Sequence, residues 1–503
     1  MRRFRFHGGW RWGFWILMVV CGSALGFVSQ PAVTPAQQQP IDQALELKTK
    51  IMGPFTLAVV GDLNYVHPVA QLADPNIQNA FKVIREADAA FGNMESNIAD
   101  YRNFKGVITG TTGPKDIAAD VKAMGFKIVT RANNHTDENG TDGMFETNHW
   151  LDEAGIVYAG VGKNLDEARA AQYLETPKGR VGLVGMYSSS QGGGGGGAAA
   201  TYKLGNVGGS PGENTLHLTM FQIVTPDQLE ELRKIRDSAY AHLAEMTNPV
   251  PPIPENEPKD RLQMSRVGEW YKAGTTPGGL SYEMNRNDLK EILRSIRNGK
   301  EYSDLMIATI HTHEDVSSLK LQFFSDAPTD FLVELAHKAI DNGADVFVGH
   351  GNHVLRPIEI YKGKPIFYGL SSFVYQLNQQ VTPIERYTEE KQDPFTTEMT
   401  DAEVQWKYWD SFERPRLIRD NMDSVIGELK YDNGQLQEII LHPIDLGYDA
   451  RLSDKGIPRI PSPETAQRIL QTLQKLSEPY GTKITIENNL GIIRVAEGQQ
   501  GKK

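Results

Sequence analysis

From residue 55 onward, the chain alternates short apolar runs with longer stretches in which apolar residues recur at helical spacing. Short apolar runs are typical of buried strands, and amphipathic stretches are typical of helices that cover a sheet. In one such stretch, Phe331, Leu335 and Ala339 repeat every four residues and so share one helical face. The alternation predicts an α/β fold of packed layers. The predicted strands are 55–60, 89–92, 127–130, 157–160, 181–186, 305–310 and 345–348, and the predicted helices are 141–154, 166–172 and 329–342.

The C-terminal part of the chain predicts two hairpins and a closing helix. The turn Asp432-Asn433-Gly434 separates two apolar alternating runs, and an Asn-Gly pair is a strong signal for a tight hairpin. The turn Lys362-Gly363-Lys364 separates another such pair. The predicted elements are a hairpin of 358–361 and 365–368, a hairpin of 425–431 and 435–442, and a helix at 463–476.

Three insertions interrupt this pattern. Residues 191–212 contain a run of six glycines, and we expect them to pack poorly and to form a mobile loop. Residues 248–258 are rich in proline, and residues 377–423 are polar with scattered aromatic side chains. Long loops in a compact domain are often lids or binding surfaces, so we expect these insertions to border a substrate cleft.

The first forty residues have the layout of an export signal. Four arginines within the first eleven residues precede an apolar run at 13–28, and a stretch rich in proline and glutamine follows at 29–40. An uncleaved N-terminal anchor is the alternative, although the apolar run is slightly short of a usual membrane span. In either case we expect an extracytoplasmic protein. The predicted organisation is 1–40 for targeting and linker, 51–380 for the main domain, and 381–503 for the part that completes it.

Charge and cysteine content exclude several classes of function. The formal net charge is −11, and an acidic chain is a poor candidate for nucleic-acid binding, which needs clustered Lys and Arg. Cys21 is the single cysteine, so the chain has no internal disulfide and no thiolate metal cage. The Gly-x-Ser-x-Gly and His-Glu-x-x-His motifs are also missing from the sequence, which argues against a serine hydrolase and a zincin.

Polar side chains with metal-binding chemistry follow five of the predicted strands. In open α/β sheets, ligands bind beyond the carboxyl ends of the strands, where the loops converge. Carboxylate, carboxamide and imidazole together suit a divalent metal such as manganese, iron or zinc, and we expect one or two ions. These residues are Asp62 and Asn64, Asn93 and Glu95, Asn133, Asn134 and His135, His311 and His313, and His350 and His353.

Each of these residues also has an ordinary structural interpretation. Gly61-Asp62 is common where a strand turns, and an acidic residue such as Glu95 often caps a helix. Because side chains alternate along a strand, we expect at most one of His311 and His313 to face the site. Only the joint position of these residues after strands favours a metal site over these separate roles.

The motifs resemble those of a known family. The chain is similar to the capsule-synthesis proteins of the poly-γ-glutamate type (the CapA family), a branch of the calcineurin-like metallophosphoesterase superfamily. The resemblance implies a four-layer α-β-β-α sandwich of the calcineurin-like metallophosphatase type. The chain departs from the family pattern at Gly351-Asn352-His353, where His-Pro-His is usual, and at Thr312-His313, where Trp-Gly is usual. The matching motifs are Gly61-Asp62, Asn93-Met94-Glu95, Ala132 to His135, His311 to His313, Gly349 to Val354 and Gly363 to Tyr368.

The resemblance also implies roles for individual residues. One metal would be held by Asp62, Asn64 and His353, with Glu95 bridging to a second. His135 would be the general acid. Arg131 and Arg356 would clamp an anionic group, with surface ion pairing as the alternative. The second metal would be held by Asn134, His311 and His350, and His313 would contact substrate or compensate for the missing family histidine.

Three functions remain open from the sequence. The first is a role in making, exporting or anchoring an anionic extracellular polymer such as poly-γ-glutamate, in contact with a polymer-synthase complex at the membrane. The second is a metal-dependent hydrolase of a phosphoester or an amide-linked polymer. The third is a non-catalytic polymer-binding protein with a degenerate metal site, which the departure at Gly351 keeps open.

Overall fold

The computed structural model describes residues 50–190, 197–246, 257–265, 268–317, 325–376, 400, 403 and 419–495. They belong to one compact unit, Gln43–Lys503. The predicted export segment, most of the glycine run and most of the insertion 377–423 lie outside the described residues. No helix in the described part of the chain has both the length and the apolar composition needed to cross a bilayer.

The first sheet has nine described strands around a parallel centre. In order across the sheet they are β22 (Thr485–Glu487), β23 (Leu490–Arg494), β21 (Gln435–Asp445), β20 (Asp423–Asp432), β1 (Pro54–Asn64), β2 (Ala89–Asn93), β5 (Ile128–Thr130) and β6 (Val157–Ala159), with β19 (Ser372–Tyr375) beside the end of β1. β1, β2, β5 and β6 run parallel, and β20 joins β1 in the antiparallel sense. The C-terminal hairpin therefore completes the sheet that the N-terminal strands begin.

The second sheet has ten described strands. In order they are β12 (Arg261–Gln263), β13 (Trp270–Ala273), β11 (Thr215–Val224), β9 (Gly179–Ser190), β15 (Leu305–His311), β16 (Val346–His350), β18 (Lys364–Phe367) and β17 (Ile358–Tyr361), with β14 (Leu280–Met284) on β11 and β8 (Gln172–Thr176) on β9. β9, β15 and β16 are parallel, so their carboxyl ends lie at one edge. Two small sheets pair β3 (Asn97–Ala99) with β4 (Thr112–Pro114) and β7 (Val161–Gly162) with β10 (Gly212–Glu213).

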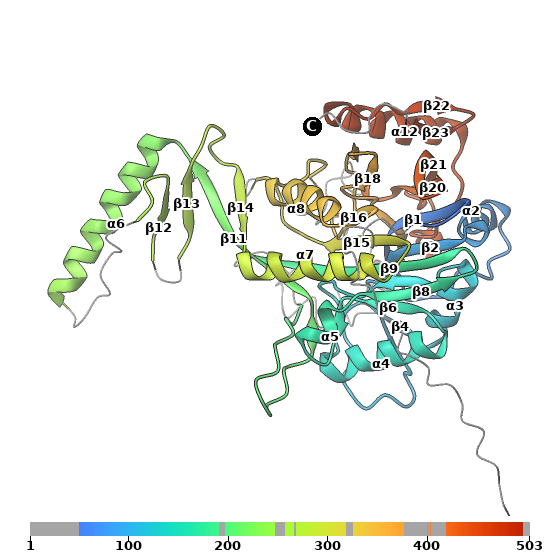
Figure 1. Cartoon of the computed structure of the whole chain (residues 1–503), viewed down its shortest axis with the longest axis horizontal. Helices are drawn as coiled ribbons and strands as arrows, with labels where there is room; N and C mark the ends of the chain where they lie inside the picture. The colour runs from blue at the N-terminus through green and yellow to red at the C-terminus, as the bar shows by residue number, and fades with distance from the viewer. Residues whose placement is uncertain are drawn as a thin grey trace, which may run out of the picture. The chain divides into compact units, whose positions relative to one another are not determined.

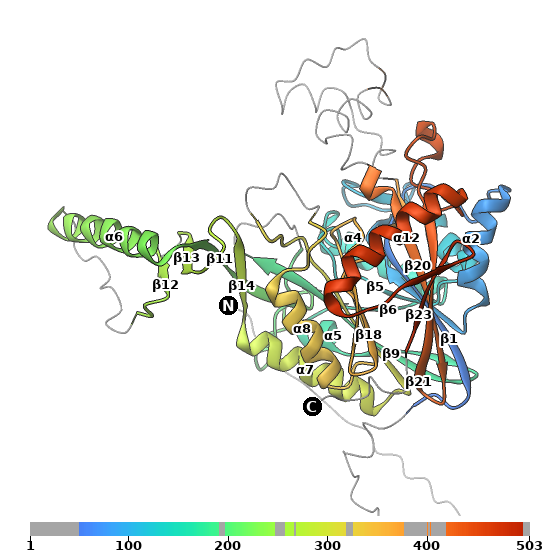
Figure 2. The ribbon, with the colours of Figure 1, turned by 90° about the horizontal axis from the view of Figure 1, so that it is seen from above.

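The side chains of β1 show how the layers form. Leu57 and Val59 point into the apolar core between the two sheets, whereas Ala58 and Val60 point to the opposite face, as strand alternation requires. The outer face of the first sheet packs against α2 (Pro75–Glu86), α3 (Asp116–Met124) and α4 (Gly140–Glu153). The outer face of the second sheet packs against α7 (Arg286–Glu301) and α8 (Asp330–Asp341), which lie side by side in Figures 1 and 2. The predicted four-layer α-β-β-α sandwich is confirmed.

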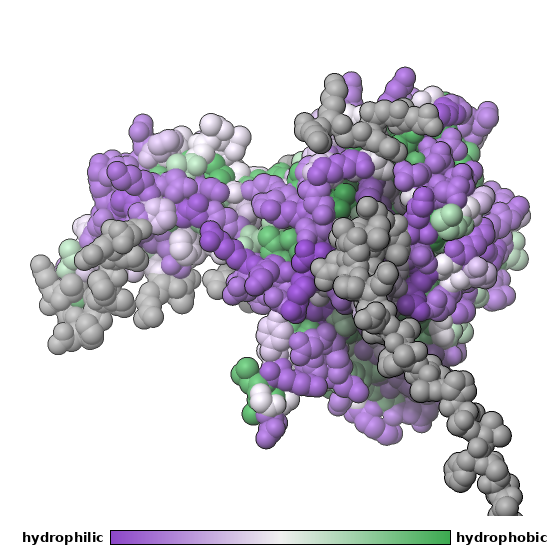
Figure 3. Space-filling view, in the orientation of Figure 1, coloured by the Kyte–Doolittle hydropathy of each residue, from purple (hydrophilic) through white to green (hydrophobic). Residues whose placement is uncertain are grey.

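Three further helices lie outside these layers. α12 (Pro463–Ser477) packs Ile469 and Leu473 against the end of the core between the sheets. α5 (Leu165–Arg169) lies beside β7, and α6 (Pro226–Met246) follows β11 and contacts β12 and β13. In Figure 1, α6, β12 and β13 extend to the side of the second sheet, and Figure 3 shows hydrophilic residues over most of the same view.

Two local predictions from the sequence need correction. The helix predicted at 166–172 ends at Arg169, because Gln172 starts β8 and pairs with Leu183 of β9. The insertion 191–212 was expected to pack poorly throughout, but Ala200 is buried against Leu165 and Ala168 of α5. Most of the following residues, 201–208, are exposed. The helices α2, α3, α6 and α7 and the strands β11 to β14 were not predicted.

Candidate metal centre

The carboxyl ends of parallel strands in both sheets meet around one buried polar cluster. In the first sheet these strands are β1, β2 and β5, and in the second they are β15 and β16. Parallel strands end at a common edge, so residues far apart in sequence are brought together there. The residues at these ends or just beyond them are Asp62 and Asn64, Glu95, Asn134 and His135, His311 and His313, and His350 and His353.

Two glycines allow the chain to approach closely at this edge. A Cβ atom on Gly61 would lie 1.8 Å from the carbonyl oxygen of Ser371, so a larger residue would separate β1 from β19. Gly351 has φ of +99°, and a Cβ there would lie 3.0 Å from Nε2 of His311. Such a backbone conformation strongly favours glycine. The residues next to both glycines are thereby held at the centre of the cluster.

Asp62 lies at the centre of the cluster and is fully buried. Its Oδ1 lies 3.4 Å from Nδ1 of His350, and its Oδ2 lies 3.2 Å from Nδ1 of His353. Gly351 donates its backbone N–H to Oδ2 at 3.1 Å, and Asn93 donates Nδ2 to Oδ1 at 2.8 Å. One carboxylate from the first sheet thus faces two imidazoles from the second.

Glu95 is the second buried acid of the cluster. Its Oε2 accepts a hydrogen bond from Nδ2 of Asn64 at 2.6 Å. Its Oε1 lies 3.7 Å from Nε2 of His311, 3.7 Å from Nε2 of His353 and 3.6 Å from Nε2 of His135. These separations are too long for hydrogen bonds. They match donor atoms that share one ion at about 2.1 Å, which lie roughly 3–4 Å apart.

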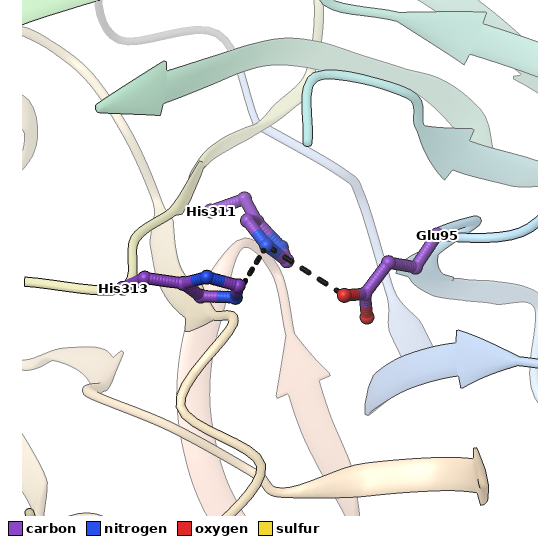
Figure 4. A group of neighbouring side chains, drawn as sticks. All are labelled: Glu95, His311 and His313. Atoms are coloured by element: carbon purple, nitrogen blue, oxygen red, sulfur yellow. Dashed lines mark hydrogen bonds and ion pairs between the residues drawn. The ribbon is translucent and has the colours of Figure 1, made fainter. Parts of the chain in front are cut away.

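His311 and His313 both belong to the cluster, so the expectation that at most one of them faces the site is wrong. Nε2 of His311 lies 3.2 Å from Nε2 of His313, and Figure 4 shows His311 between His313 and Glu95. Side chains two residues apart along an extended chain point to the same side, so His311, the last residue of β15, and His313 both face the cluster. Two sets of donor atoms each lie within 4.8 Å of one another: Glu95, His311 and His313, and Asp62, Glu95 and His353.

Several buried polar atoms of the cluster have no hydrogen-bond partner among the described residues. They are Oε1 of Glu95, Oδ1 of Asn64 and Nε2 of His350, together with Oδ1 of Asn134 in the loop that carries His135. Burying a polar atom without a partner costs about 1–3 kcal/mol. Such atoms gathered in one place are expected where a bound ion supplies the missing interaction. The residues present therefore fit a divalent metal, and the donor set of carboxylate, amide and imidazole matches manganese, iron or zinc.

The pKa shifts within the cluster also favour a bound cation. Burial opposes ionisation of Asp62, but His350 and His353 hold its pKa well below the ordinary value. Burial and the nearby charge of Asp62 raise the pKa of Glu95 well above the ordinary value. Burial, together with the nearby charge of His313, lowers the pKa of His311 well below the ordinary value, which leaves a neutral imidazole. A cation between the two acids would relieve the repulsion that acts on Glu95.

Arg131 and Arg356 are both buried, whereas arginines that clamp an anion from solvent are exposed. Arg131 is fully buried, and its guanidinium donates to the backbone carbonyl of Met94 at 3.0 Å and to Oδ1 of Asn97 at 3.0 Å. Arg356 is also buried and donates Nε to the backbone carbonyl of Ser325 at 2.9 Å. Arg131 thus fixes the loop that carries Glu95. Contact of either arginine with substrate stays a prediction.

Asn93 and Asn133 support the cluster, and the sequence placed them among the polar residues at the strand ends without assigning them a ligand or catalytic role. Nδ2 of Asn93 contacts both Asp62 and Nδ1 of His311, at 2.8 and 3.0 Å. Asn133 donates Nδ2 to Oδ1 of Asn93 at 3.1 Å, and its Oδ1 accepts the backbone N–H of His135 at 3.2 Å. Both residues stand in the quoted motifs. The sequence signal was their position directly before a proposed ligand.

Comparison with known proteins identifies the family. A profile described as "Bacterial capsule synthesis protein PGA_cap" matches residues 56–377. The chain belongs to this capsule synthesis family. The matched region begins in β1 and reaches past β19, so it includes every residue of the cluster. The resemblance inferred from the motifs is therefore confirmed.

Individual relatives span most of the chain. The uncharacterized protein y4sH of Sinorhizobium fredii is 39% identical over 458 residues, which cover 89% of this chain and 94% of that protein. The PGA biosynthesis protein CapA of Bacillus subtilis is 22% identical, covering 66% of each chain. The capsule biosynthesis protein CapA of Bacillus anthracis is 22% identical, covering 64% of this chain and 60% of that protein. Among solved structures, a candidate 5′-nucleotidase from Staphylococcus aureus is 10% identical, covers 62% of this chain and 48% of its own, and has a TM-score of 0.29.

Proposed function

We propose that this protein acts outside the cytoplasm in making, exporting or anchoring a capsule polymer such as polyglutamate, through a metal-dependent hydrolytic site. The observation that carries the proposal is the buried cluster in which His350 and His353 face Asp62, while Oε1 of Glu95 has no hydrogen-bond partner among the described residues. Membership of the capsule synthesis family supports the polymer as substrate. A polymer-synthase complex at the membrane is the proposed partner.

The proposed ligands fall into two groups that share Glu95. Asp62, Asn64 and His353 would hold one ion, because Nδ1 of His353 lies 3.2 Å from Asp62 and Asn64 contacts Glu95 at 2.6 Å. When bound, the metal supplies a Lewis acid that polarises the bond to be cleaved. The second ion would be held by Asn134, His311 and His350, with His313 close enough to His311 to add a nitrogen.

His135 is placed to move a proton. Its Nδ1 lies 2.7 Å from Oε1 of Glu138, and its Nε2 points toward the cluster, 3.6 Å from Oε1 of Glu95. A carboxylate this close to one ring nitrogen of a histidine attracts a proton to that nitrogen. The side chain is partly exposed, so it can reach both substrate and solvent. We assign it as the general acid that protonates the leaving group at Nε2.

The experiment that tests this proposal measures metal and hydrolysis together. Purified full-length protein is reconstituted with manganese or zinc, analysed for metal, and assayed on polyglutamate and on p-nitrophenyl phosphate. Asp62→Asn should weaken metal binding by more than the ~10–100-fold typical of a residue behind the ligands. His135→Ala should keep the metal but slow hydrolysis by ~10²–10⁴-fold.

Asp120→Asn is the matched control for Asp62→Asn. Asp120 is buried too, but its carboxylate accepts the backbone N–H groups of Val69 and Ala70 away from the cluster. This variant should retain the metal. Cleavage of the phosphoester alone would replace the polymer with a phosphoester as substrate. No metal after reconstitution would refute the hydrolase and leave the non-catalytic binding protein.

A further inference from the structure

A cavity of about 810 Å³ lies beside the cluster, and none of the proposed metal ligands lines it. Its walls come from the end of β9, the middle of β11, the start of β13 and the end of β14. In Figure 1 these strands lie where the second sheet continues toward α6. The cavity is therefore a separate feature of the part of the chain that extends from the sandwich.

A change of strand partners creates this cavity. β11 pairs with β9 through Thr215–Leu218 and with β13 through Phe221–Val224. β14 pairs with the opposite edge of β11 over Leu218–Gln222, so β9 and β13 occupy one edge in succession. Between them, Thr219 and Met220 face no described strand on that edge, and both line the cavity. The opening is thus built into the sheet topology.

The lining is mixed polar and apolar and contains no lysine or arginine. Its histidine, His217, has Nδ1 2.7 Å from Oδ2 of Asp288, and this contact raises the pKa of His217. The carboxylate of Glu283 is already paired with Nη1 of Arg261 at 2.6 Å, and that of Glu269 accepts the hydroxyl of Tyr271 at 2.6 Å. A polyanion entering the cavity would meet these two acids without a free positive charge. The cavity therefore disfavours the anionic polymer itself.

The remaining groups match a neutral chain rich in hydroxyls. Trp270 offers an indole ring, held edge-on against Phe221 at 5.6 Å, and aromatic faces stack on the C–H faces of sugar rings. The carboxamide of Gln222 offers both a donor and an acceptor. Asn285 offers only its amide N–H groups, because its Oδ1 accepts the backbone N–H groups of Asn287 and Asp288 at the start of α7. Ser190 is buried to within 6% of full enclosure, and its hydroxyl has no partner among the described residues. We propose that this cavity binds an oligosaccharide.

The cavity lies within reach of the metal cluster. The ring of Tyr187 on β9 is 6.1 Å from the ring of His311. Ser189 and Ser190 follow two and three residues later, which is roughly 7–10 Å at the ~3.3 Å rise of an extended residue. A bound sugar chain would lie beside the cluster, so the protein could hold a glycan and a capsule polymer together. The proposal goes beyond the hydrolytic function and does not depend on it.

The test is isothermal titration calorimetry of the purified full-length protein with cellohexaose, chitohexaose, maltohexaose and polyglutamate, each titrated separately. At least one oligosaccharide should bind. Trp270→Ala should weaken that binding at least tenfold, and Ser190→Ala should weaken it without a cost in folding, because the hydroxyl makes no hydrogen bond within the described chain. Trp150→Ala, on α4 and outside the cavity, is the matched control and should bind as the unmodified protein does.

Three results would overturn the proposal. The first is that none of the three oligosaccharides binds. The second is oligosaccharide binding that survives both Trp270→Ala and Ser190→Ala. The third is polyglutamate binding that Trp270→Ala removes, which would assign the cavity to the anionic polymer. If the Trp270→Ala protein keeps its metal and its hydrolytic activity, any of these three results would contradict the oligosaccharide proposal and leave the proposed hydrolytic function untouched.

Discussion

Replacing Gly351 by alanine tests whether the loop after β16 holds the cluster together. Gly351 has φ of +99° and donates its backbone N–H to Oδ2 of Asp62 at 3.1 Å. An alanine Cβ there would lie 2.7 Å from the carbonyl oxygen of Thr312 and 3.0 Å from Nε2 of His311. The backbone must therefore move away from Thr312 and His311, and this movement disturbs the hydrogen bond to Asp62. That movement should weaken the cluster and the fold together.

The expected loss of stability has two parts. A non-glycine residue in a left-handed conformation costs about 1–2 kcal/mol. A buried hydrogen bond to a charged acceptor contributes about 1.5–3 kcal/mol. Gly351→Ala should therefore lower the free energy of unfolding by about 2.5–5 kcal/mol.

Gly363→Ala is the matched control. Gly363 also has positive φ, +76°, in the turn between β17 and β18, but a Cβ there would meet nothing within 4 Å. This variant should lose only the conformational part, about 1–2 kcal/mol. Urea unfolding of the metal-free proteins, followed by circular dichroism, gives both values under conditions where metal binding adds nothing. Equal losses in the two variants would refute the argument that Gly351 is required by its contact with Asp62.

Two further predictions concern export and acid stability. A fusion of residues 1–40 to a reporter that is active only outside the cytoplasm should be active, and an inactive, cytoplasmic fusion would contradict the predicted export signal. His442 contacts Glu428 at 2.8 Å and holds the pKa of that carboxyl below its ordinary value. Because the folded pKa is the lower one, Glu428 stabilises the fold above the ordinary pKa of glutamate, about 4.3, and less as the pH falls through the folded pKa. The free energy of unfolding of the unmodified protein and of Glu428→Gln is measured by urea unfolding at several pH values. The difference between the two should shrink from about pH 6 to about pH 3. A difference that stays constant would argue against the Glu428–His442 pair.

The sequence contained enough information for the sandwich and for the region of the cluster. Buried parallel strands appear as short apolar runs, and β1, β2, β15 and β16 were each located to within a few residues. The residues at the ends of those runs carry the metal-binding chemistry, so the same apolar runs that located the strands also located the candidate site. Helices α2 and α7 were missed, although Asp74 and Asn285 cap them through their side chains. Asp and Asn are also common in turns, so these residues did not distinguish the start of a helix from a turn.

The finer geometry depends on where a strand ends, which a sequence pattern does not fix to one residue. His313 lies two residues after His311, the last residue of β15, and both imidazoles face the cluster, as side chains two apart on an extended chain do. Arg131 was expected beside an anionic group because it flanks one of the motifs. In the structure it is enclosed, and it donates to the backbone carbonyls of Met94 and Ser96. The burial of Arg131 does not follow from spacing, because it depends on contacts with a distant segment of the chain.

The departure from the family motif after β16 does not by itself imply a degenerate site. His350 is the last residue of β16, and its Nδ1 lies 3.4 Å from Asp62. Gly351 then adopts a left-handed conformation and Asn352 donates to the backbone carbonyl of Val354, while His353, also left-handed with φ of 51°, places Nδ1 3.2 Å from Asp62. Left-handed backbone at a residue other than glycine is strained and persists where surrounding contacts enforce it; here Ser371 donates its hydroxyl to the backbone carbonyl of His353 at 3.0 Å. The loop is strained at His353, yet it holds the imidazoles of His350 and His353 against the carboxylate of Asp62. Retaining this strained arrangement favours a working metal site over a binding protein that has lost its metal.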